Sequence, residues 1–322
     1  MDVSVIIPTY NGAEKLRLTL RALQVQSFPG RWEVIVVNNA STDHTDEVVT
    51  ELATAYGVPL DLVHEPRPGA SAARNQGARS ARGGVLLFLD DDMIAPPDLV
   101  ARHFETVTSN PRTWVLGQAR YPDRIRSTAF GRFRDSLHAL IVEDAGLVEV
   151  DSFASGNCSM PAEDLRLVGG YNEEFTTAAL EDADLYVRAR RHGRRVVIDP
   201  RIVAVNNDWA VASLEEFCRR QRIYSRSAPI LQARFGDDHP RAEWVRKNSP
   251  ASRTDSPGLL CNKLARAVLG TDRVQRGLYR AAGLLERSWP DSRTLRTIYR
   301  SAIAGSMYRG MGEGSDVDAR RA

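Results

Sequence analysis

The residues with the clearest chemical potential are three adjacent aspartates, Asp90, Asp91 and Asp92. They come directly after the apolar run at residues 85–89, which predicts a buried strand. Three neighbouring carboxylates repel one another unless a cation or hydrogen-bond donors offset their charge. Carboxylate oxygens are hard ligands of the kind that Mg²⁺ and Mn²⁺ prefer. The pattern therefore favours a site for a metal-bound diphosphate over its alternative, an acidic turn without metal.

Two further polar clusters, at residues 9–11 and 38–43, also follow apolar runs directly. In open α/β sheets, ligands bind outside the carboxyl ends of the strands. We therefore expect these clusters and the three aspartates to meet at one edge of a sheet. Residues 41–43 taken alone would be interpreted as a helix cap.

The elements that must position these clusters alternate along the first hundred residues. Short apolar, β-branched runs are followed by longer amphipathic segments, a pattern typical of βαβ units in a parallel sheet. We expect strands at residues 3–7, 32–37, 60–64 and 85–89, and helices at 15–24, 46–56 and 70–80. Farther on we expect strands at 114–120, 195–198 and 202–205, helices at 163–168, 180–192 and 214–233, and an irregular or helical excursion at 125–140. The fold class predicted is α/β, with a mostly parallel sheet flanked by helices.

The C-terminal third differs in composition and charge. We expect an α/β domain at residues 1–236, a polar linker at 237–256, amphipathic helices that carry arginine at 257–309 and a disordered tail at 310–322. From Arg241 onward there are 16 Lys and Arg against 8 Asp and Glu, whereas the preceding residues have 27 against 33. The basic region is thus expected to meet something anionic: a membrane surface, nucleic acid or the acidic body of the protein itself.

The cysteine pattern and the start of the chain indicate a cytoplasmic protein. Three widely spaced cysteines without a CxxC pair imply neither a disulfide framework nor a zinc site. Met1 leads directly into the first apolar run, without a basic segment or a small-residue cleavage site. No apolar run approaches the roughly 18 residues that would span a bilayer, so membrane contact is expected to be peripheral, at the inner face of the membrane.

Several segments together resemble the inverting family-2 glycosyltransferases, which have the nucleotide-sugar-binding GT-A fold. The resemblance covers about residues 3–230, and its motifs stand in the family's order. The matching segments are VIIPTYN at 5–11, VIVVNNASTD at 34–43, GASAARNQG at 69–77, LFLDDD at 87–92, SGN at 155–157 with VGGYNEEF at 168–175, and ED at 181–182.

The resemblance implies a donor site for a sugar linked to a nucleoside diphosphate, with Mg²⁺ or Mn²⁺ as cofactor. Asp92 corresponds to the metal ligand of the D-x-D motif, Asp90 to the carboxylate that holds the ribose or shares the metal site, and Asp91 to the variable middle position. The positions that correspond to nucleotide contacts are Pro8, Thr9, Tyr10, Asn11, Asn38, Asn39, Ser41 and Arg74, together with Asp90 and Asp91.

The resemblance also implies an acceptor side and a catalytic base. Gly156 and Asn157 belong to the acceptor-side segment. Asp182 corresponds to the base that takes the proton of the attacking hydroxyl, and Glu181 beside it orients the acceptor or only flanks the base. The alternative for this pair is a helix N-terminus stabilised by the helix dipole.

Three features depart from the family's pattern. Many relatives have Asp where this chain has Asn38 or Asn39; an Asn side chain can accept a hydrogen bond from a uracil or thymine N–H, which leaves the base identity open. The strand at 202–205 leads into Asn and Asp instead of the His that many relatives have, and Asp208 is the candidate replacement for that His. Gln221 does not begin the Q-x-x-R-W motif of processive synthases.

We therefore predict a hexosyltransferase-type, metal-dependent inverting enzyme that transfers one sugar, from a UDP- or dTDP-sugar, to a hydroxyl acceptor in cell-envelope or polysaccharide biosynthesis. The acceptor is a sugar, a lipid-linked molecule or a small molecule, and nucleic acid is not expected as a partner. The alternatives are a catalytically silent nucleotide-sugar-binding module and, less favoured, a sugar nucleotidyltransferase, which should show an early Gly-rich loop with Arg and Lys. The chain has no such loop, no GxxxxGK motif and no dinucleotide fingerprint.

Overall fold

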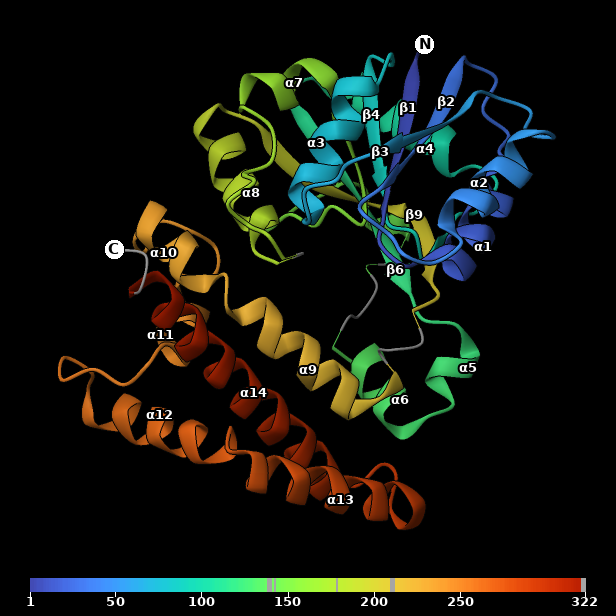
Figure 1. Ribbon diagram of the computed structural model, residues 1–322. Coiled ribbons are helices and arrows are strands. Elements are labelled where there is room, and N and C mark those ends of the chain that lie inside the picture. Colours follow the sequence, from blue (N-terminus) through green and yellow to red (C-terminus); the bar gives the residue numbers. More distant parts are fainter. Residues whose placement is uncertain (138–140, 142, 178, 209–211, 320–322) are drawn as a thin grey trace. The chain divides into compact units, whose positions relative to one another are not determined.

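The computed structural model describes the whole chain except residues 138–140, 142, 178, 209–211 and 320–322 (Figure 1). It divides into two compact units, each built from two stretches of sequence. Unit 1 comprises Met1–Pro122 and Ala139–Asp208, and unit 2 comprises Asp123–His138 and Trp209–Ala322. This division differs from the expected boundary after residue 236, and it assigns the excursion after residue 122 to the C-terminal unit.

Unit 1 is built around one mixed sheet with the strand order β3-β2-β1-β4-β8-β6-β9-β5, and β7 pairs with β9. The first four strands of the chain run parallel, β8 is antiparallel to β4, and β6 is antiparallel to β8. The strand bounds are β1 Val3–Thr9, β2 Trp32–Asn38, β3 Leu60–His64, β4 Val85–Leu89, β5 Met93–Ile94, β6 Thr113–Arg120, β7 Val148–Glu149, β8 Asn157–Pro161 and β9 Arg195–Asn206.

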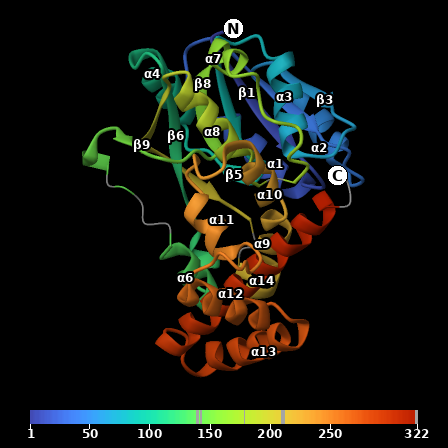
Figure 2. The ribbon, with the colours of Figure 1, turned by 90° about the vertical axis from the view of Figure 1, so that its left-hand side faces the viewer.

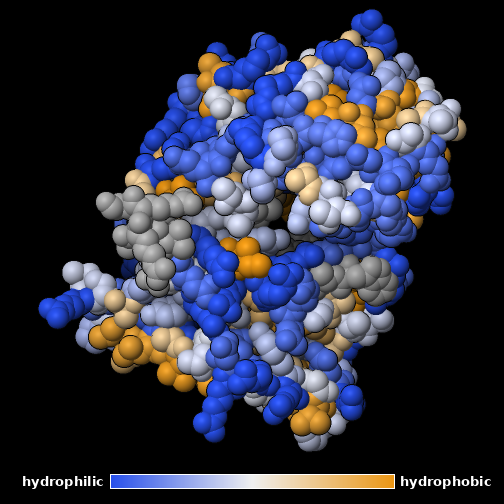
Figure 3. Space-filling model, viewed as in Figure 1, coloured by the Kyte–Doolittle hydropathy of each residue, from blue (hydrophilic) through white to orange (hydrophobic). Residues whose placement is uncertain are grey.

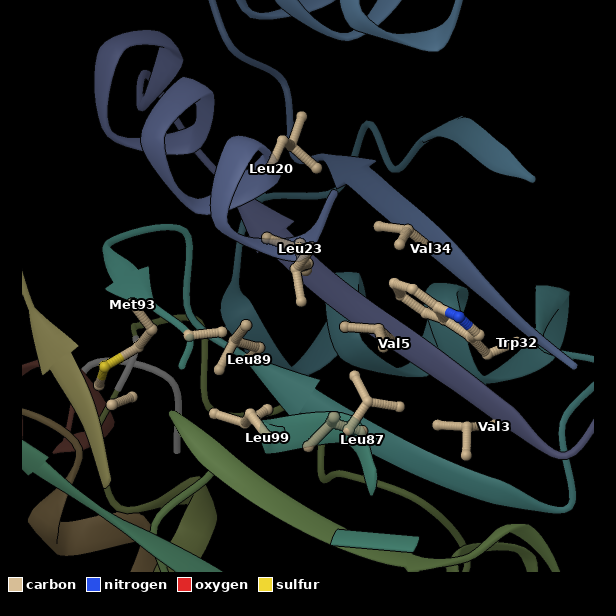
Figure 4. Close-up of a cluster of buried hydrophobic side chains, with 14 of the residues drawn as sticks. Val3, Val5, Leu20, Leu23, Trp32, Val34, Leu87, Leu89, Met93 and Leu99 are labelled. Carbon is tan, nitrogen blue, oxygen red and sulfur yellow. The ribbon is translucent and has the colours of Figure 1, made fainter. Parts of the chain in front are cut away.

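Helices connect and cover these strands. Their bounds are α1 Ala13–Leu23, α2 Thr45–Ala53, α3 Ala70–Ser80, α4 Leu99–Ser109, α7 Ala162–Leu167 and α8 Glu181–Arg191, with a 3₁₀ turn at Glu143–Ala145. Helix α1 turns Leu20 and Leu23 onto the strands that carry Val5 and Val34 (Figure 4). Burial of such side chains contributes about 1.5–3 kcal/mol each and fixes where the strands end.

The predicted strands at 195–198 and 202–205 are one strand, β9, in the structure. Pro200 lies between them, and it has no N–H to donate to a ladder. The pairing of β9 with β6 shifts its register at this place, between Leu116 and Gln118, and then continues. The proline therefore interrupts the pairing without ending the strand.

Unit 2 consists of helices, with a core of side chains from both of its stretches. Phe130 and Phe133 from the first stretch pack against Phe217, Leu295 and Tyr299 from the second. The helix bounds are α5 Asp123–Arg126, α6 Ala129–Asp135, α9 Leu214–Ser225, α10 Ala228–Phe235, α11 Ala242–Asn248, α12 Pro257–Leu269, α13 Asp272–Ser288 and α14 Arg293–Ala319. Figure 2 shows α12 and α13 lying along α14.

The segment expected to be a disordered tail is helical through Ala319, so this prediction differs from the structure; its last three residues lie outside the described part of the chain. The glycines of the segment allow α14 to approach α9 closely: a Cβ at Gly310 would collide with the carbonyl of Arg222, and one at Gly314 with that of Arg226. Glu313 accepts hydrogen bonds from both arginines. The composition of residues 310–322 suggested disorder because composition alone does not reveal that α9 packs beside this segment.

Likewise, the expected linker contains a helix, α11, and the expected helix at 214–233 is divided into α9 and α10. Pro229 occupies the first turn of α10, a position that proline tolerates at the start of a helix but not in its interior. Within the described residues, no helix is both long and apolar enough to cross a membrane.

Candidate functional site

The structure brings the three polar clusters together at the carboxyl ends of β1, β2 and β4. The Thr9 hydroxyl donates to Asp91 Oδ2 at 2.6 Å, and the Asn39 N–H donates to the Thr9 carbonyl at 2.9 Å. Asn11 and Ser41 also meet, since the Asn11 N–H donates to Ser41 Oγ at 3.0 Å. The parallel register of these strands places their ends at one edge, as the sequence predicted.

Asp91, the middle aspartate, faces the interior beneath this edge. Besides the bond from Thr9, its carboxylate lies 3.9 Å from Lys15 Nζ, and its carbonyl accepts from the Thr19 hydroxyl at 2.8 Å. A Cβ at Gly12 would collide with this carboxylate, so only glycine leaves room for it. Burial raises the pKa of Asp91 to about 6. The sequence did not identify Lys15, because nothing in its spacing linked it to the aspartates.

Asp92 lies against the end of β9. The Asn206 side chain donates to Asp92 Oδ1 at 3.4 Å, and the Asn207 N–H donates to the Asp92 carbonyl at 2.8 Å. Burial, together with the negative charges of the other two aspartates and of Asp208, holds the pKa of Asp92 well above its usual range. Asp208 is thus close enough to affect the pKa of Asp92, while Trp209 lies outside the described residues.

Arg74 connects the aspartates to the start of α8. It is buried, and its two terminal nitrogens donate to Asp90 Oδ1 at 3.2 Å and to Glu181 Oε1 at 2.9 Å. Its guanidinium also lies 5.5 Å from the centre of the Tyr171 ring. One cation therefore holds together two carboxylates that are 91 residues apart in the sequence.

Glu181 and Asp182 occupy the first turn of α8. Leu180, the residue before the helix, has a φ of 68°, a left-handed conformation that is unusual for a branched side chain and that turns the backbone into α8. Glu181 is only 3% exposed, and its Oε2 has no hydrogen-bond partner among the residues that the structure describes. Burial, followed by the charge of Asp182, raises the pKa of Glu181 to about 8.

The orientation of Asp182 is fixed by Ser155, in the loop before β8. The Ser155 hydroxyl donates to Asp182 Oδ1 and its N–H donates to Oδ2 at 3.0 Å. The Tyr171 hydroxyl donates in turn to Ser155 Oγ at 2.9 Å. Burial raises the pKa of Asp182, while Arg74 and the two bonds from Ser155 act in the opposite direction. Ser155 and Tyr171 lie within segments quoted for the family resemblance, but the sequence assigned them no role.

The two residues expected on the acceptor side separate in the structure. Gly156 lies at the site: its carbonyl accepts from the Asp90 N–H at 3.0 Å, and a Cβ there would stand 2.6 Å from Asp90 Oδ2. The Asn157 side chain instead points into the core, where it contacts His103 Nε2 at 2.9 Å and donates to the Gln118 carbonyl. Asn157 begins β8, and successive strand residues point to opposite faces.

Asn38 and Asn39, expected to contact the nucleotide, are buried and bonded within the chain. The Asn38 side chain donates to Asp46 Oδ1 at 2.6 Å and accepts from the Ser41 N–H at 2.8 Å. The Asn39 side chain donates to two carbonyls and accepts from the Gly69 N–H at 2.8 Å. The structure thus gives both amides the task of shaping the loops around the site, which the sequence did not predict.

Two residues at the end of β1 remain open to solvent. Tyr10 is 65% exposed, and Pro8 is partly exposed. Because Tyr10 directly follows Thr9, its ring stands at the same edge as the aspartates and is available to a planar ligand.

The aspartates fit a divalent cation only in part. No three His, Cys, Asp or Glu side chains gather closely enough to enclose a metal among the residues that the structure describes. Burial and, after it, the negative charges of Asp90 and Asp91 raise the pKa of Asp92, and a bound cation would offset these charges. Mg²⁺ is commonly held by one or two carboxylates together with substrate phosphates and water. Asp92 and Asp90 match that incomplete donor set.

A cavity of about 810 Å³ lies at the opposite end of β4, near Gly83 and Leu86. Asn75, the neighbour of Arg74, reaches it and bonds to Tyr171 and Glu173. Its arginines Arg79 and Arg82 already face carboxylates of the same unit. The buried carboxylates and Arg74 described above therefore lie at the other edge of the sheet, away from this cavity.

Comparison with known proteins agrees with this geometry. Residues 4–137 match the family model of glycosyl transferase family 2. A glycosyltransferase of Haloferax volcanii, AglE, is 35% identical over 132 residues, which are 41% of this chain and 43% of that protein. Validoxylamine A glucosyltransferase of Streptomyces hygroscopicus subsp. limoneus is 30% identical over 268 residues, with 74% of this chain and 57% of that protein covered.

Solved structures show the same fold. The mannosyltransferase PcManGT from Pyrobaculum calidifontis, in complex with GDP-Man and Mn²⁺, superposes with a TM-score of 0.58 at 23% identity and covers 95% of this chain and 86% of that one. S. aureus TarS 1–349 in complex with UDP gives a TM-score of 0.54 at 18% identity, with 94% and 91% covered.

The fold is of the GT-A class, like that of these structural neighbours. The chain belongs to glycosyltransferase family 2. It spans between about a third and three fifths of the length of the first curated relatives that it matches.

Proposed function

We propose that this protein transfers a single sugar from a nucleoside diphosphate sugar to a hydroxyl group of an acceptor, with inversion at the sugar carbon. The base of the donor nucleotide is uracil or thymine. The observation that carries the proposal is the position of Arg74, which joins Asp90 in the donor-side cluster to Glu181 in the first turn of α8. A donor site and a carboxylate pair are thereby fixed against each other, as a displacement reaction requires. If Arg74 contacted only the donor-side aspartate, the arrangement would support binding of the donor but would not position a base for the reaction.

On the donor side, we propose that Asp92 and Asp90 hold Mg²⁺ or Mn²⁺ against the diphosphate, and that the exposed ring of Tyr10 stacks on the base. A divalent cation at this position would offset the charge that develops on the departing diphosphate. Complexes of the structural neighbours with GDP-Man and Mn²⁺, and with UDP, support a metal-assisted nucleotide site. Asn38 and Asn39 act indirectly in this scheme, because their amides hold the surrounding loops.

On the acceptor side, we propose Asp182 as the general base. The acceptor oxygen forms a bond to the sugar carbon while the bond from that carbon to the diphosphate oxygen breaks, and the electron pair leaves with the diphosphate. Asp182 accepts the proton of the acceptor hydroxyl, and its raised pKa suits it to this task near neutral pH. Ser155 holds the carboxylate in place, and Gly156 leaves room beside Asp90. Glu181 positions Arg74.

The proposal is tested by calorimetric titration of UDP, dTDP, GDP and ADP into the wild type and into Asp92→Ala, each with and without Mn²⁺. We expect metal-dependent binding of UDP or dTDP by the wild type and loss of the metal dependence in the variant. Leu264→Ala, on an exposed face of unit 2, is a matched control that should bind as the wild type does. If no nucleotide binds in the presence of Mn²⁺, the proposed function is wrong; tight GDP binding alone would correct the base.

The alternative, a nucleotide-sugar-binding module without turnover, predicts the same titrations. The two differ in Asp182→Asn, which keeps the shape of the side chain and removes the base. We expect unchanged nucleotide affinity and a turnover number lower by about 10²–10⁴-fold, because a positioned base contributes this much. Product formation is measured by release of the nucleoside diphosphate. A wild type that binds the donor but turns over no more than Asp182→Asn with any acceptor would favour the silent module.

The proposed setting is cell-envelope or polysaccharide biosynthesis, with a sugar, a lipid-linked molecule or a small molecule as acceptor. Peripheral attachment to a membrane would bring the enzyme to a lipid-linked acceptor.

A further inference from the structure

Helix α12 in unit 2 holds a lysine inward and exposes several of its apolar side chains. Lys263 is 2% exposed and Arg266 is half-buried, whereas Leu264 is 53% and Val268 60% exposed. A helix on the surface of a soluble protein ordinarily does the reverse, with an apolar stripe toward the core and charges toward water. The residues around α12 must therefore explain why a charged side chain is buried while apolar side chains of the same helix are exposed.

The inward orientation is held by specific bonds. Lys263 Nζ donates to Asp255 at 2.9 Å, to Ser249 Oγ at 3.2 Å and to the Pro250 carbonyl at 3.3 Å. Arg266 donates to the side chain of Asn248. A buried ammonium group is tolerated only when it is paired and hydrogen-bonded, so rotation of α12 about its axis would leave a buried carboxylate without its cation. These bonds therefore keep the opposite side of the helix exposed.

That opposite side forms a continuous surface, which we call the apolar face of α12. Its members share solvent exposure and helical spacing, at intervals of four, three, one and three residues. They are Pro257, Cys261, Leu264, Ala265 and Val268. Hydrophobic atoms gather over α12 in the space-filling view (Figure 3).

Helix α13 follows after only Gly270 and Thr271, and it presents a row of four exposed arginines on one side, which we call the arginine row. None of the four forms an ion pair with any residue that the structure describes. Leu284 stands beside the row and is 67% exposed. Both helices pack on α14: the Gln275 side chain of α13 donates to the Ala302 carbonyl, whereas the members of the apolar face and of the arginine row are exposed. Arg276 stands at the edge of the row, in a pocket that Arg309 of α14 also lines. The row consists of Arg273, Arg276, Arg280 and Arg287.

We propose that this surface docks on an anionic lipid bilayer, with the apolar face of α12 inserted between the lipid headgroups and the acyl chains, and the arginine row of α13 on the lipid phosphates. An apolar helix face flanked by arginines has the chemistry that an anionic interface binds. A second copy of the chain fits less well, because it carries the same arginine row and an isologous contact would bring these like charges together. The proposal does not rest on the proposed catalytic function.

The chain contains its own reporter for this surface. Cys261 is exposed on the apolar face, and the other two cysteines, Cys158 and Cys218, are buried. A polarity-sensitive fluorophore on Cys261 of the full chain should shift its emission to the blue with phosphatidylglycerol-containing vesicles, and nitroxides on the acyl chains should quench it. Vesicles of pure phosphatidylcholine should have much less effect, and added salt should weaken the response.

Two pairs of variants test the two parts of the surface in vesicle flotation. Leu264→Glu/Val268→Glu should abolish flotation, with Leu18→Glu/Val25→Glu as the matched change at exposed apolar positions of unit 1. Arg276→Gln/Arg280→Gln should weaken partitioning roughly 30-fold, since each arginine near an anionic surface contributes about a fivefold factor and the two factors multiply. Arg21→Gln/Arg31→Gln is its control. All substituted side chains are exposed, so thermal unfolding should be unchanged.

Three outcomes would overturn the proposal. One is the absence of any emission shift or flotation with anionic vesicles. A second is equal loss of flotation in the control pairs, which would show a response to charge alone. A third is a concentration-dependent dimer in sedimentation velocity that Leu264→Glu/Val268→Glu converts to monomer, together with no vesicle binding; this would assign the face to a second copy. Nucleotide binding, measured separately, reports on the catalytic unit, so a failure of either proposal can be distinguished.

Discussion

At the scale of residues, the site is a chain of charges that depends on one buried arginine. Arg74 contacts Asp90 on one side and Glu181 on the other, and Tyr171 lies against its guanidinium. The tyrosine hydroxyl then reaches Asp182 through Ser155. The pKa of the proposed base is thus set by burial, by Arg74 of helix α3 and by Ser155 of the loop before β8.

Ser155→Ala should shift the pH dependence of kcat/KM. Asp182 must be deprotonated to accept a proton, so activity falls as the pH drops through its pKa, which burial raises above the usual range for an aspartate. The Ser155 hydroxyl lowers this pKa by bonding to the carboxylate, and its removal should move the acid limb of the profile to higher pH.

The control for this change is Ser159→Ala, which removes another buried hydroxyl on β8 that bonds to His103 and does not touch Asp182. Its acid limb should coincide with that of the wild type. An acid limb that stays in place in Ser155→Ala would show that a group other than Asp182 limits the reaction at low pH.

At the scale of elements, the site depends on how closely helices approach the sheet. Helix α3 carries Arg74, and it lies on β1 and β2 at Gly77, where a Cβ would collide with Ile6 and stand 3.1 Å from Val37 Cγ2. The same kind of contact recurs in unit 2, where Gly310 and Gly314 let α14 approach α9. Glycine lowers helix propensity by up to about 1 kcal/mol relative to alanine. Its presence in these helices is therefore explained by close packing and not by helix propensity.

Gly77→Ala should consequently destabilise the protein although alanine is the better helix former. Overpacking costs about 1–3 kcal/mol, which exceeds the gain in propensity, so the midpoint of thermal unfolding should fall. Gly277→Ala is the matched control, since it is also within a helix but has no atom near its Cβ position. That variant should be as stable as the wild type or more stable; a higher midpoint for Gly77→Ala would contradict the packing argument.

At the scale of the whole molecule, charge and chemistry are divided between the two units. The proposed catalytic residues all belong to unit 1, and the basic surface belongs to unit 2. Unit 2 also takes residues 123–138 from the middle of the chain, and their aromatic side chains help to form its core. The C-terminal helices are therefore completed by a segment inserted into the sequence of unit 1, and they cannot be regarded as an appendage added after it.

The sequence by itself determined strands β1 to β4, β6 and the two halves of β9, the edge where the polar ends of the parallel strands meet, and the family; it did not predict β5, β7 or the central strand β8. Apolar runs such as residues 85–89 are long enough to identify buried strands, and Asp90 follows directly, so the chain's own order places it at the strand end. Helix positions were predicted equally well where apolar periodicity was strong, as in α1 and α8.

Only the tertiary structure decided which way individual side chains point and which segments become partners. Asn39 and Asn157 turn into hydrogen bonds with partners far away in sequence, and Asn38 bonds to Asp46 and to the Ser41 N–H nearby. The residues after Gly310 form a helix because α9 lies beside them, and α12 exposes its apolar face because Lys263 is bound inward by Asp255. These outcomes depend on which side chains meet once the chain is folded, and the periodicity of the sequence does not encode that.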